Sequence, residues 1–161
     1  MAGANIYYAK SFGAKFDGTT NDLAYIQNAI DAAYNAGGGD VYCAPGTSLV
    51  GVGNTTNSGL SIAPGGYMLL MRNNVNLFGA GMGVTTLKAG HRNNLIIAYQ
   101  SSRFGIYDMT LDGATYIDNA DPLKLSACQY VTVRDVEIKG GGSYGMNIIG
   151  CQDVLAENCY A

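Results

Sequence analysis

The sequence predicts an all-β solenoid, a stack of parallel β-coils that begins with one covering helix. The first observation is an internal repeat: residues 122–138 align without a gap with residues 145–161, which places Cys128 on Cys151 at a shift of 23 residues. Short alternating segments with a period in the twenties indicate coils that each rest on their neighbours. The second observation is composition, because 23 of 161 residues are glycine and only 13% are charged. Such a chain is typical of a β-body with many turns.

The same repeat continues toward the N-terminus with a longer spacing. Residues 104–113 align with residues 131–140 at a shift of 27 residues, and the segment NVNLFGAG at 74–81 precedes them. The sequence therefore predicts several successive coils.

One helix is expected over residues 22–36, after a polar loop at 11–22. Thr20 or Asn21 can cap its start, and three glycines at 37–39 end it. Its apolar positions recur at helical spacing, whereas the opposite side is polar, so the helix should cover the coils with one side only. The apolar positions are Leu23, Ile26, Ile30 and Ala33.

Strands are expected along the rest of the chain, separated by polar loops at 52–66 and 112–121. In VTVRDVEI the apolar parity changes between Val133 and Val136, which predicts a corner of the coil at Arg134-Asp135. The expected strands are 40–46, 67–71, 74–79, 93–99, 104–111, 122–126, 130–138, 145–149 and 153–160.

Length and charge restrict the class of protein. We expect residues 1–161 to form a single β-helix domain, with the helical cap at about 20–37, coils over about 40–161 and an uncapped C-terminal end. The net charge is −3 and basic residues do not cluster, which argues against nucleic acid as a partner. An apolar run of membrane-spanning length is absent, and MAGANIYYAK lacks the pattern of a secretory signal.

Several motifs, in this order, resemble a known family. They are FGAKFDGTTND, IQNAIDAAYNAGGGDVY, NVNLFGAGMGVTTLKAG, RFGIYDMTLDG, VTVRDVEI and SYGM. The chain resembles the N-terminal cap and first coils of the pectate-lyase-like superfamily of right-handed parallel β-helices, and within it the catalytic module of the mannuronan (alginate) C5-epimerases. Phage tailspikes share the cap motif. The resemblance implies a long shallow groove that binds an extended, usually acidic, polysaccharide.

The resemblance also implies where catalytic residues would lie. The family carries a Tyr-Gly-x-Asp-x-His pattern, with another Asp one coil later. Tyr144 matches, but Asn147 stands at the Asp position and Ile149 at the His position, and the fourth position falls beyond Ala161. Neither an amide nor an alkyl group can act as a proton donor and acceptor in epimerisation or lyase cleavage. We therefore expect a catalytically incomplete chain. Strand alternation predicts that Asn147 and Ile149 face outward.

Other residues can contact a substrate. Lys124 lies at the outward position one coil before Asn147, and with Arg134 and Lys139 it can pair with a uronate carboxylate; solvated charges on the coil surface explain these side chains equally well. Tyr144 can stack on a sugar ring. His91, the single histidine, is expected to be a solvated loop residue.

The acidic residues have two interpretations. Asp108 and Asp135 align at a coil corner, where a structural role is favoured over catalysis. Three others, Asp112, Asp118 and Asp121, lie in one loop and can ligate calcium, although their spacing matches no strict motif and a solvated loop is the simpler reading. Calcium is thus a possible cofactor, and none is firmly implied.

The four cysteines, Cys43, Cys128, Cys151 and Cys159, do not have zinc-site spacing. Cys128 and Cys151 occupy equivalent positions on successive coils, so their Cα atoms should lie about 4.8 Å apart. Parallel side chains suit a disulfide poorly, and a buried ladder of thiols is favoured.

Two functions of different class remain. One is a polysaccharide-binding segment of an epimerase-like or lyase-like protein, and the other is a structural or assembly module, such as part of a phage tailspike or an extracellular appendage. Either implies an extracellular or virion-associated location. The open last coil predicts a homo-oligomer or a partner protein at that end.

Overall fold

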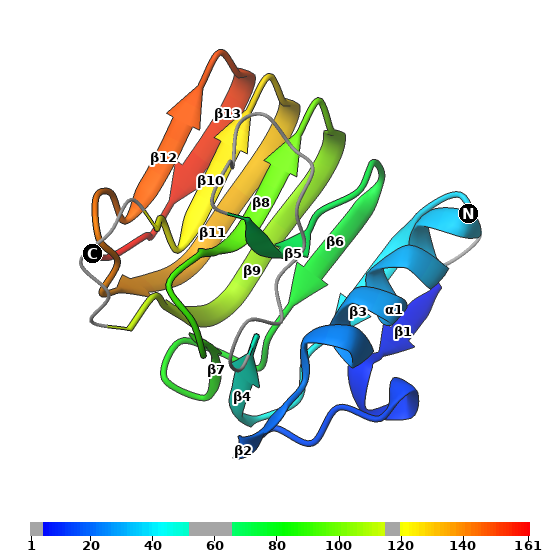
Figure 1. The fold of residues 1–161 in the computed structure, drawn as a ribbon. Helices are drawn as coiled ribbons and strands as arrows, with labels where there is room; N and C mark the ends of the chain where they lie inside the picture. Colours follow the sequence, from blue (N-terminus) through cyan, green and yellow to red (C-terminus); the bar gives the residue numbers. More distant parts are fainter. Residues whose placement is uncertain (1–4, 52–65, 115–119) are drawn as a thin grey trace.

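The computed structural model describes residues 5–51, 66–114 and 120–161 and shows a right-handed parallel β-helix of about five turns. Figure 1 shows the coils stacked along one axis, with helix α1 (Leu23–Asn35) at the N-terminal end and strands β12 and β13 at the other. The predicted fold class is confirmed.

The coils present three faces, each a ladder of parallel strands. The first face consists of β1 (Ile6–Tyr8), β3 (Gly39–Tyr42), β6 (Val75–Phe78), the first parts of β9 (Ser102–Asp112) and β11 (Gln129–Lys139), and β13 (Gln152–Glu157). The second face consists of β2 (Asp17–Asn21), β4 (Gly46–Val50), β7 (Thr85–Ala89) and the later parts of β9 and β11. The third face consists of β5 (Tyr67–Leu70), β8 (Asn94–Tyr99), β10 (Leu123–Ser126) and β12 (Met146–Ile149).

Single residues in the left-handed conformation make the corner between the first and second faces. Asp108 and Asp135 have φ values of 55° and 54°, and the pairing of β9 with β11 steps over both. Asn158 has a φ of 49° at the matching place after β13. The corner predicted at Arg134-Asp135 is confirmed. Asp and Asn adopt this conformation at lower cost than most residues, which explains their recurrence there.

The strands with clear apolar alternation were predicted correctly, within a few residues at their ends. The polar loop expected at 11–22 was wrong, because this segment contains the end of a 3-10 helix (Ala9–Phe12) and strand β2. Strand β2 reads Asp-Gly-Thr-Thr-Asn and pairs irregularly with β4, so it lacks an apolar pattern. Strands β1, β4 and β7 were also missed. Most of the loops expected at 52–66 and 112–121 falls outside the described residues.

Helix α1 takes the place that a third-face strand occupies in later coils. Ile26, Ala29, Ile30 and Ala33 are fully buried in the main core, against which Leu23 also packs. The predicted apolar side of the helix is confirmed, and Ala29 also belongs to it. Asn21 accepts the N–H of Leu23 (3.2 Å). The N-cap residue is Asp22 rather than either predicted residue, and the Thr20 hydroxyl donates to Asp17 (2.8 Å).

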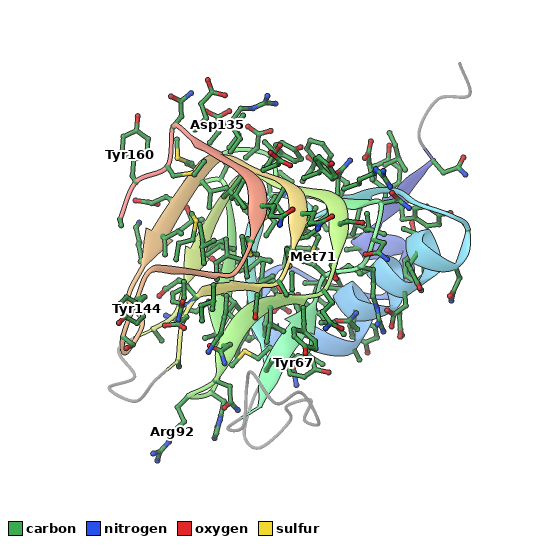
Figure 2. All side chains as sticks on the ribbon, turned by 90° about the horizontal axis from the view of Figure 1, so that it is seen from above. Tyr67, Met71, Arg92, Asp135, Tyr144 and Tyr160 are labelled. Atoms are coloured by element: carbon green, nitrogen blue, oxygen red, sulfur yellow. The ribbon has the colours of Figure 1, made fainter. Side chains whose placement is uncertain are left out.

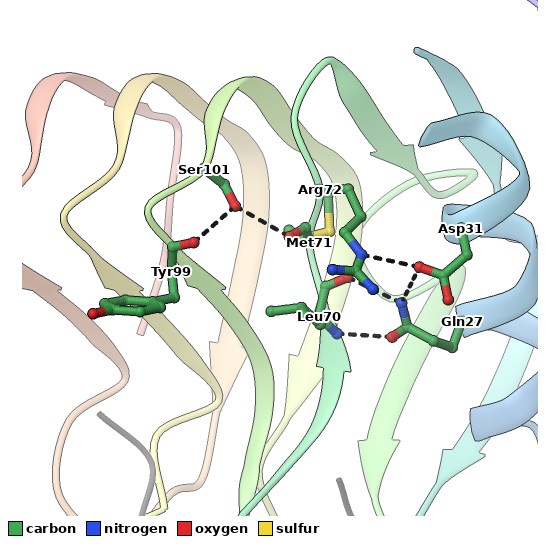
Figure 3. A network of polar contacts seen from close by, with 7 residues as sticks. All are labelled: Gln27, Asp31, Leu70, Met71, Arg72, Tyr99 and Ser101. Carbon is green, nitrogen blue, oxygen red and sulfur yellow. Dashed lines mark hydrogen bonds and ion pairs between the residues drawn. The ribbon is translucent and has the colours of Figure 1, made fainter. Parts of the chain in front are cut away.

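The polar side of α1 also contacts the coils, which corrects the expectation that the helix covers them with its apolar side only. The Gln27 side chain donates from Nε2 to the Leu70 carbonyl (3.1 Å) and accepts the Leu70 N–H at Oε1 (2.8 Å), as a neighbouring strand would (Figure 3). Asp31 accepts from Gln27 (3.1 Å) and pairs with Arg72 (3.0 Å). The helix thus covers the otherwise free edge of β5 and protects it from pairing with another chain.

Candidate functional site

The candidate site lies on the third face, at β10 and β12. The register pairs Lys124 with Asn147 and Ser126 with Ile149, while Leu123 and Leu125 stack on Met146 and Ile148. Asn147 and Ile149 therefore occupy the outward positions that alternation predicted. The Tyr144 side chain is 61% exposed in the segment just before β12. We call Asp121, Lys124, Tyr144, Asn147 and Ile149 the third-face site.

Asp121 contacts two other residues of this site, whereas the sequence interpretation considered it only as a possible calcium ligand. It is only 2% exposed, and its carboxylate accepts the Tyr144 N–H at Oδ1 (3.1 Å) and the Asn147 amide at Oδ2 (2.8 Å). Its own N–H donates to Asn94 Oδ1 (3.0 Å). The sequence does contain a signal for this contact. At the shift of 23 residues, Asp121 aligns with Tyr144, so the two residues lie side by side on neighbouring coils.

The outward side chains of the third-face site are an amide, an alkyl group and an ammonium group. Asn147 already uses its amide N–H to contact Asp121, which leaves its carbonyl oxygen as an acceptor. Ile149 is 50% exposed and can neither donate nor accept a proton. Lys124 contributes a positive charge beside them.

Two of the predicted substrate contacts lie elsewhere, which is a correction. The Arg134 guanidinium sits over the Tyr107 ring on the first face (5.2 Å to the centroid) and 3.4 Å from Asp135. Tyr107 in turn stacks on Phe78, with ring centroids 4.5 Å apart. Lys139 pairs with Glu137 on the second face (3.0 Å). Both charges have partners along the coil surface, and neither belongs to the third face that carries Lys124 and Asn147.

The remaining candidates do not join the third-face site as catalytic groups. His91 lies in the loop before β8, with a ring nitrogen 3.4 Å from the Asn93 amide. The Asp135 carboxylate contacts the side chains of Arg134 and Asn158, in line with a structural role at the corner.

In the part of the chain that the structure describes, the acidic residues predicted as calcium ligands do not form a preformed binding site. Asp118 lies outside the described residues. Asp112 accepts the Ala114 N–H (2.8 Å) and faces Lys88 (3.9 Å), and Asp121 is engaged as above. Among the described residues, His, Cys, Asp and Glu side chains do not gather in groups of three or more that could hold a metal ion.

The cysteines are free thiols in the structure. Cys151 Sγ accepts the N–H of Cys128 (3.4 Å), which places the two on neighbouring coils as the repeat predicted. Burial raises the pKa of Cys43 to about 12 and also raises that of Cys128. Both therefore stay protonated and pack as small apolar groups.

The fold and the site define a class of protein, and comparison with known proteins agrees with it. Residues 6–120 match the family model described as rhamnogalacturonase A/epimerase, pectate lyase-like. The chain belongs to this family of pectate lyase-like parallel β-helices.

The resemblance to mannuronan C5-epimerases is also confirmed. The chain is 36% identical over 158 residues to mannuronan C5-epimerase AlgE6 of Azotobacter vinelandii, an alignment that covers 88% of this chain and 17% of the relative. It is 36% identical over 160 residues to alginate lyase 7 of the same organism, covering 88% of this chain and 18% of that protein. The chain thus spans less than a fifth of the length of these two relatives.

Solved structures extend the comparison. The A-module of AlgE6 superposes with a TM-score of 0.75 at 29% identity, covering 95% of this chain and 47% of the module. ORF18 of Geobacillus virus E2 superposes with a TM-score of 0.69 at 26% identity, covering 88% of this chain and 27% of that one. In the described ranges, α1 and any other helical segment are too short or too polar to cross a membrane.

Proposed function

We propose that this chain is a polysaccharide-binding β-helix segment of the mannuronan C5-epimerase type, which holds an extended acidic glycan on its third face without epimerising or cleaving it. The observation that carries the proposal is the pair Asn147 and Ile149, side chains without acid–base chemistry at the two outward positions where the related enzymes would need it. The similarity to mannuronan C5-epimerases and to a virus protein supports an extracellular or virion-associated location.

The binding role follows from what the third-face site presents to solvent. Lys124 can pair with a uronate carboxylate, and the adjacent Asn147 carbonyl can accept from a sugar hydroxyl. The exposed Tyr144 ring offers an apolar surface for the CH face of a pyranose. The parallel strands repeat every 4.8 Å or so, which suits a polymer better than a small molecule.

We expect binding of polymannuronate without turnover. Loss of an acid or base group typically costs about 10² to 10⁴ in rate, and here both positions are affected. The measurement combines a binding isotherm with C5-proton exchange and detection of unsaturated products. Lys124→Gln should weaken binding several-fold, whereas Lys10→Gln, an exposed lysine near the N-terminal end, should not. Turnover like that of an active epimerase, or equal effects of the two variants, would contradict the proposal.

Restoring the missing groups should not restore activity by itself. In the variant Asn147→Asp with Ile149→His, the new carboxylate would face Asp121 Oδ2, which Asn147 now contacts at 2.8 Å. Two carboxylates at this separation cannot both be ionised at little cost, so the pair should retain a proton near neutral pH. We expect no measurable C5-proton exchange from this double variant, and strong exchange would show that the two substitutions alone silence the site.

A structural or assembly module is the second candidate, supported by the similarity to ORF18 of Geobacillus virus E2. In the part of the chain that the structure describes, β12 and β13 each have a neighbour on one side only. Ile148 points inward yet is 44% exposed, and Leu155 is 53% exposed on the outer side of β13. Apolar side chains beside free strand edges favour contact with another copy or a partner protein.

The polypeptide should therefore self-associate when it is studied alone. For the polypeptide of residues 1–161, we expect sedimentation velocity at several concentrations to show a weight-average coefficient that rises with concentration, because association removes the exposed Ile148 and Leu155 side chains from water. A single monomeric species at all concentrations, with cooperative unfolding, would contradict this expectation.

A further inference from the structure

The second face carries a depression that the function above does not use. It has a volume of about 350 Å³ and is lined by Met82, Gly83, Glu137, Lys139 and Tyr160. We call these five residues the second-face depression. Met82 and Tyr160 are 37% and 60% exposed, so both side chains are accessible to a ligand.

One wall is a loop that the fold holds in place. Residues 79–84 connect β6 to β7 and lean over the next coil, where Gly81 donates its N–H to the Asp108 carbonyl (2.8 Å). Gly83 donates its N–H to Thr110 Oγ1 (2.9 Å). The space where a Gly83 side chain would lie is open, so the tip of this loop borders the depression instead of filling it.

The opposite wall is Tyr160. Thr110 pairs with Glu137 on the next coil, and Glu137 pairs with Tyr160 on the coil after that. The Tyr160 N–H donates to the Val136 carbonyl (3.1 Å) and its carbonyl accepts the Ile138 N–H (2.7 Å), so its backbone is fixed beside Glu137. The volume of about 350 Å³ lies at the lower end of the range for small-molecule sites, so the depression has room for one sugar ring.

The floor between the walls is polar, and the negative charge of Glu137 is balanced by the positive charge of Lys139. Glu137 Oε2 accepts from the Thr110 hydroxyl (2.8 Å) and lies 3.0 Å from Lys139 Nζ. The hydrogen bonds from Lys139 and Thr110 lower the pKa of Glu137, so this carboxylate is ionised at neutral pH. Lys88 and Asp112 form the adjacent pair, 3.9 Å apart. The four charges sum to zero.

These features together select a class of ligand. An aromatic ring would cover Glu137 and Lys139 without replacing their contacts with water, which is unfavourable. A uronate would meet the Glu137 carboxylate, and the balanced floor offers it no net attraction. A neutral sugar can donate a hydroxyl to Glu137 Oε1 and accept from Lys139, while its CH faces contact Met82 and Tyr160.

We propose that the second-face depression binds one neutral hexopyranose ring of a glycan. This site is separate from the third-face site: Figure 2 shows Tyr160 and Tyr144 on different parts of the surface, and Tyr160 pairs with Glu137 of β11 whereas Tyr144 lies just before β12. The inference goes beyond the function proposed above and does not depend on it.

The test is a titration of the ¹⁵N-labelled chain followed by amide chemical shifts, with mannotetraose as the neutral probe and tetramannuronate as the acidic one. Mannotetraose should shift the amides of Gly83, Thr110 and Glu137. Tyr160→Ala should weaken its binding about fivefold to tenfold, since one stacking wall is lost. Tyr130→Ala, an equally exposed tyrosine on the first face, is the matched control and should leave the affinity unchanged. Glu137→Gln keeps the shape and should weaken binding to a smaller degree.

Three results would overturn the inference. They are the absence of shifts at these amides up to tens of millimolar mannotetraose, equal effects of Tyr160→Ala and Tyr130→Ala, and a preference of these amides for tetramannuronate. Shifts by tetramannuronate at Lys124 and Asn147 report on the third-face site alone. Failure of one proposal is therefore distinguishable from failure of the other.

Discussion

Replacing Ile26 with Asp should unfold the protein or bring it close to unfolding. Ile26 is 0% exposed in the side of α1 that closes the N-terminal end of the coils. A carboxylate there must be buried without a partner or must keep its proton, and either costs several kcal/mol. Domains of this size are stable by only about 5 to 15 kcal/mol. We expect urea unfolding followed by circular dichroism to show a midpoint shifted far to lower concentration, or no folded baseline.

Asn28→Asp is the matched control for this change. It places the same new charge on the same helix, but Asn28 is exposed, so water solvates the carboxylate. Its midpoint should stay close to that of the parent. If Ile26→Asp unfolds like the parent, or if both variants lose the same stability, then α1 does not cover the first coil in the way that the structure shows.

Replacing Asp22 with Ala should have the second largest effect. Asp22 is 0% exposed, and its carboxylate accepts the N–H of Lys15 (2.9 Å) and of Phe16 (3.0 Å) and the hydroxyl of Ser48 (3.0 Å). It thereby joins the chain before β2 to strand β4. Alanine leaves these donors without their acceptor, at about 1 to 3 kcal/mol each, so we expect a loss of about 3 kcal/mol or more in the free energy of unfolding.

Asp17→Ala provides the comparison, because Asp17 also accepts several hydrogen bonds, from Thr19 and Thr20, but at the exposed start of β2. Water can replace an exposed acceptor, so this variant should lose much less stability. Asp22→Asn, which keeps the shape and one acceptor oxygen, should fall between the two. A loss for Asp17→Ala as large as that for Asp22→Ala would show that burial is not the cause.

The candidate site was predictable where alternation and the repeat operate, and not elsewhere. Strand parity placed Asn147 and Ile149 outward and Lys124 beside Asn147, since a strand has a period of two and successive coils stack in register. Parity says nothing about which face of the coil a strand belongs to. Arg134 was therefore grouped with Lys124, although the corner at Asp135 and the stack on Tyr107 place it on another face.

The β-helix, the covering helix, the corner at Asp135 and the stacking register could be predicted from the sequence, because each follows from a local period or a short repeat. Contacts between coils that lack such a period became visible in the folded chain. Strand β2 forms without apolar alternation, because Asp22 and β4 hold it. Asp121 becomes a site residue only through the 2.8 Å contact with Asn147 in the next coil. Gln27 covers the edge of β5 from 43 residues away in the sequence. Partners so distant along the chain meet only when the coils stack, so no local pattern records them.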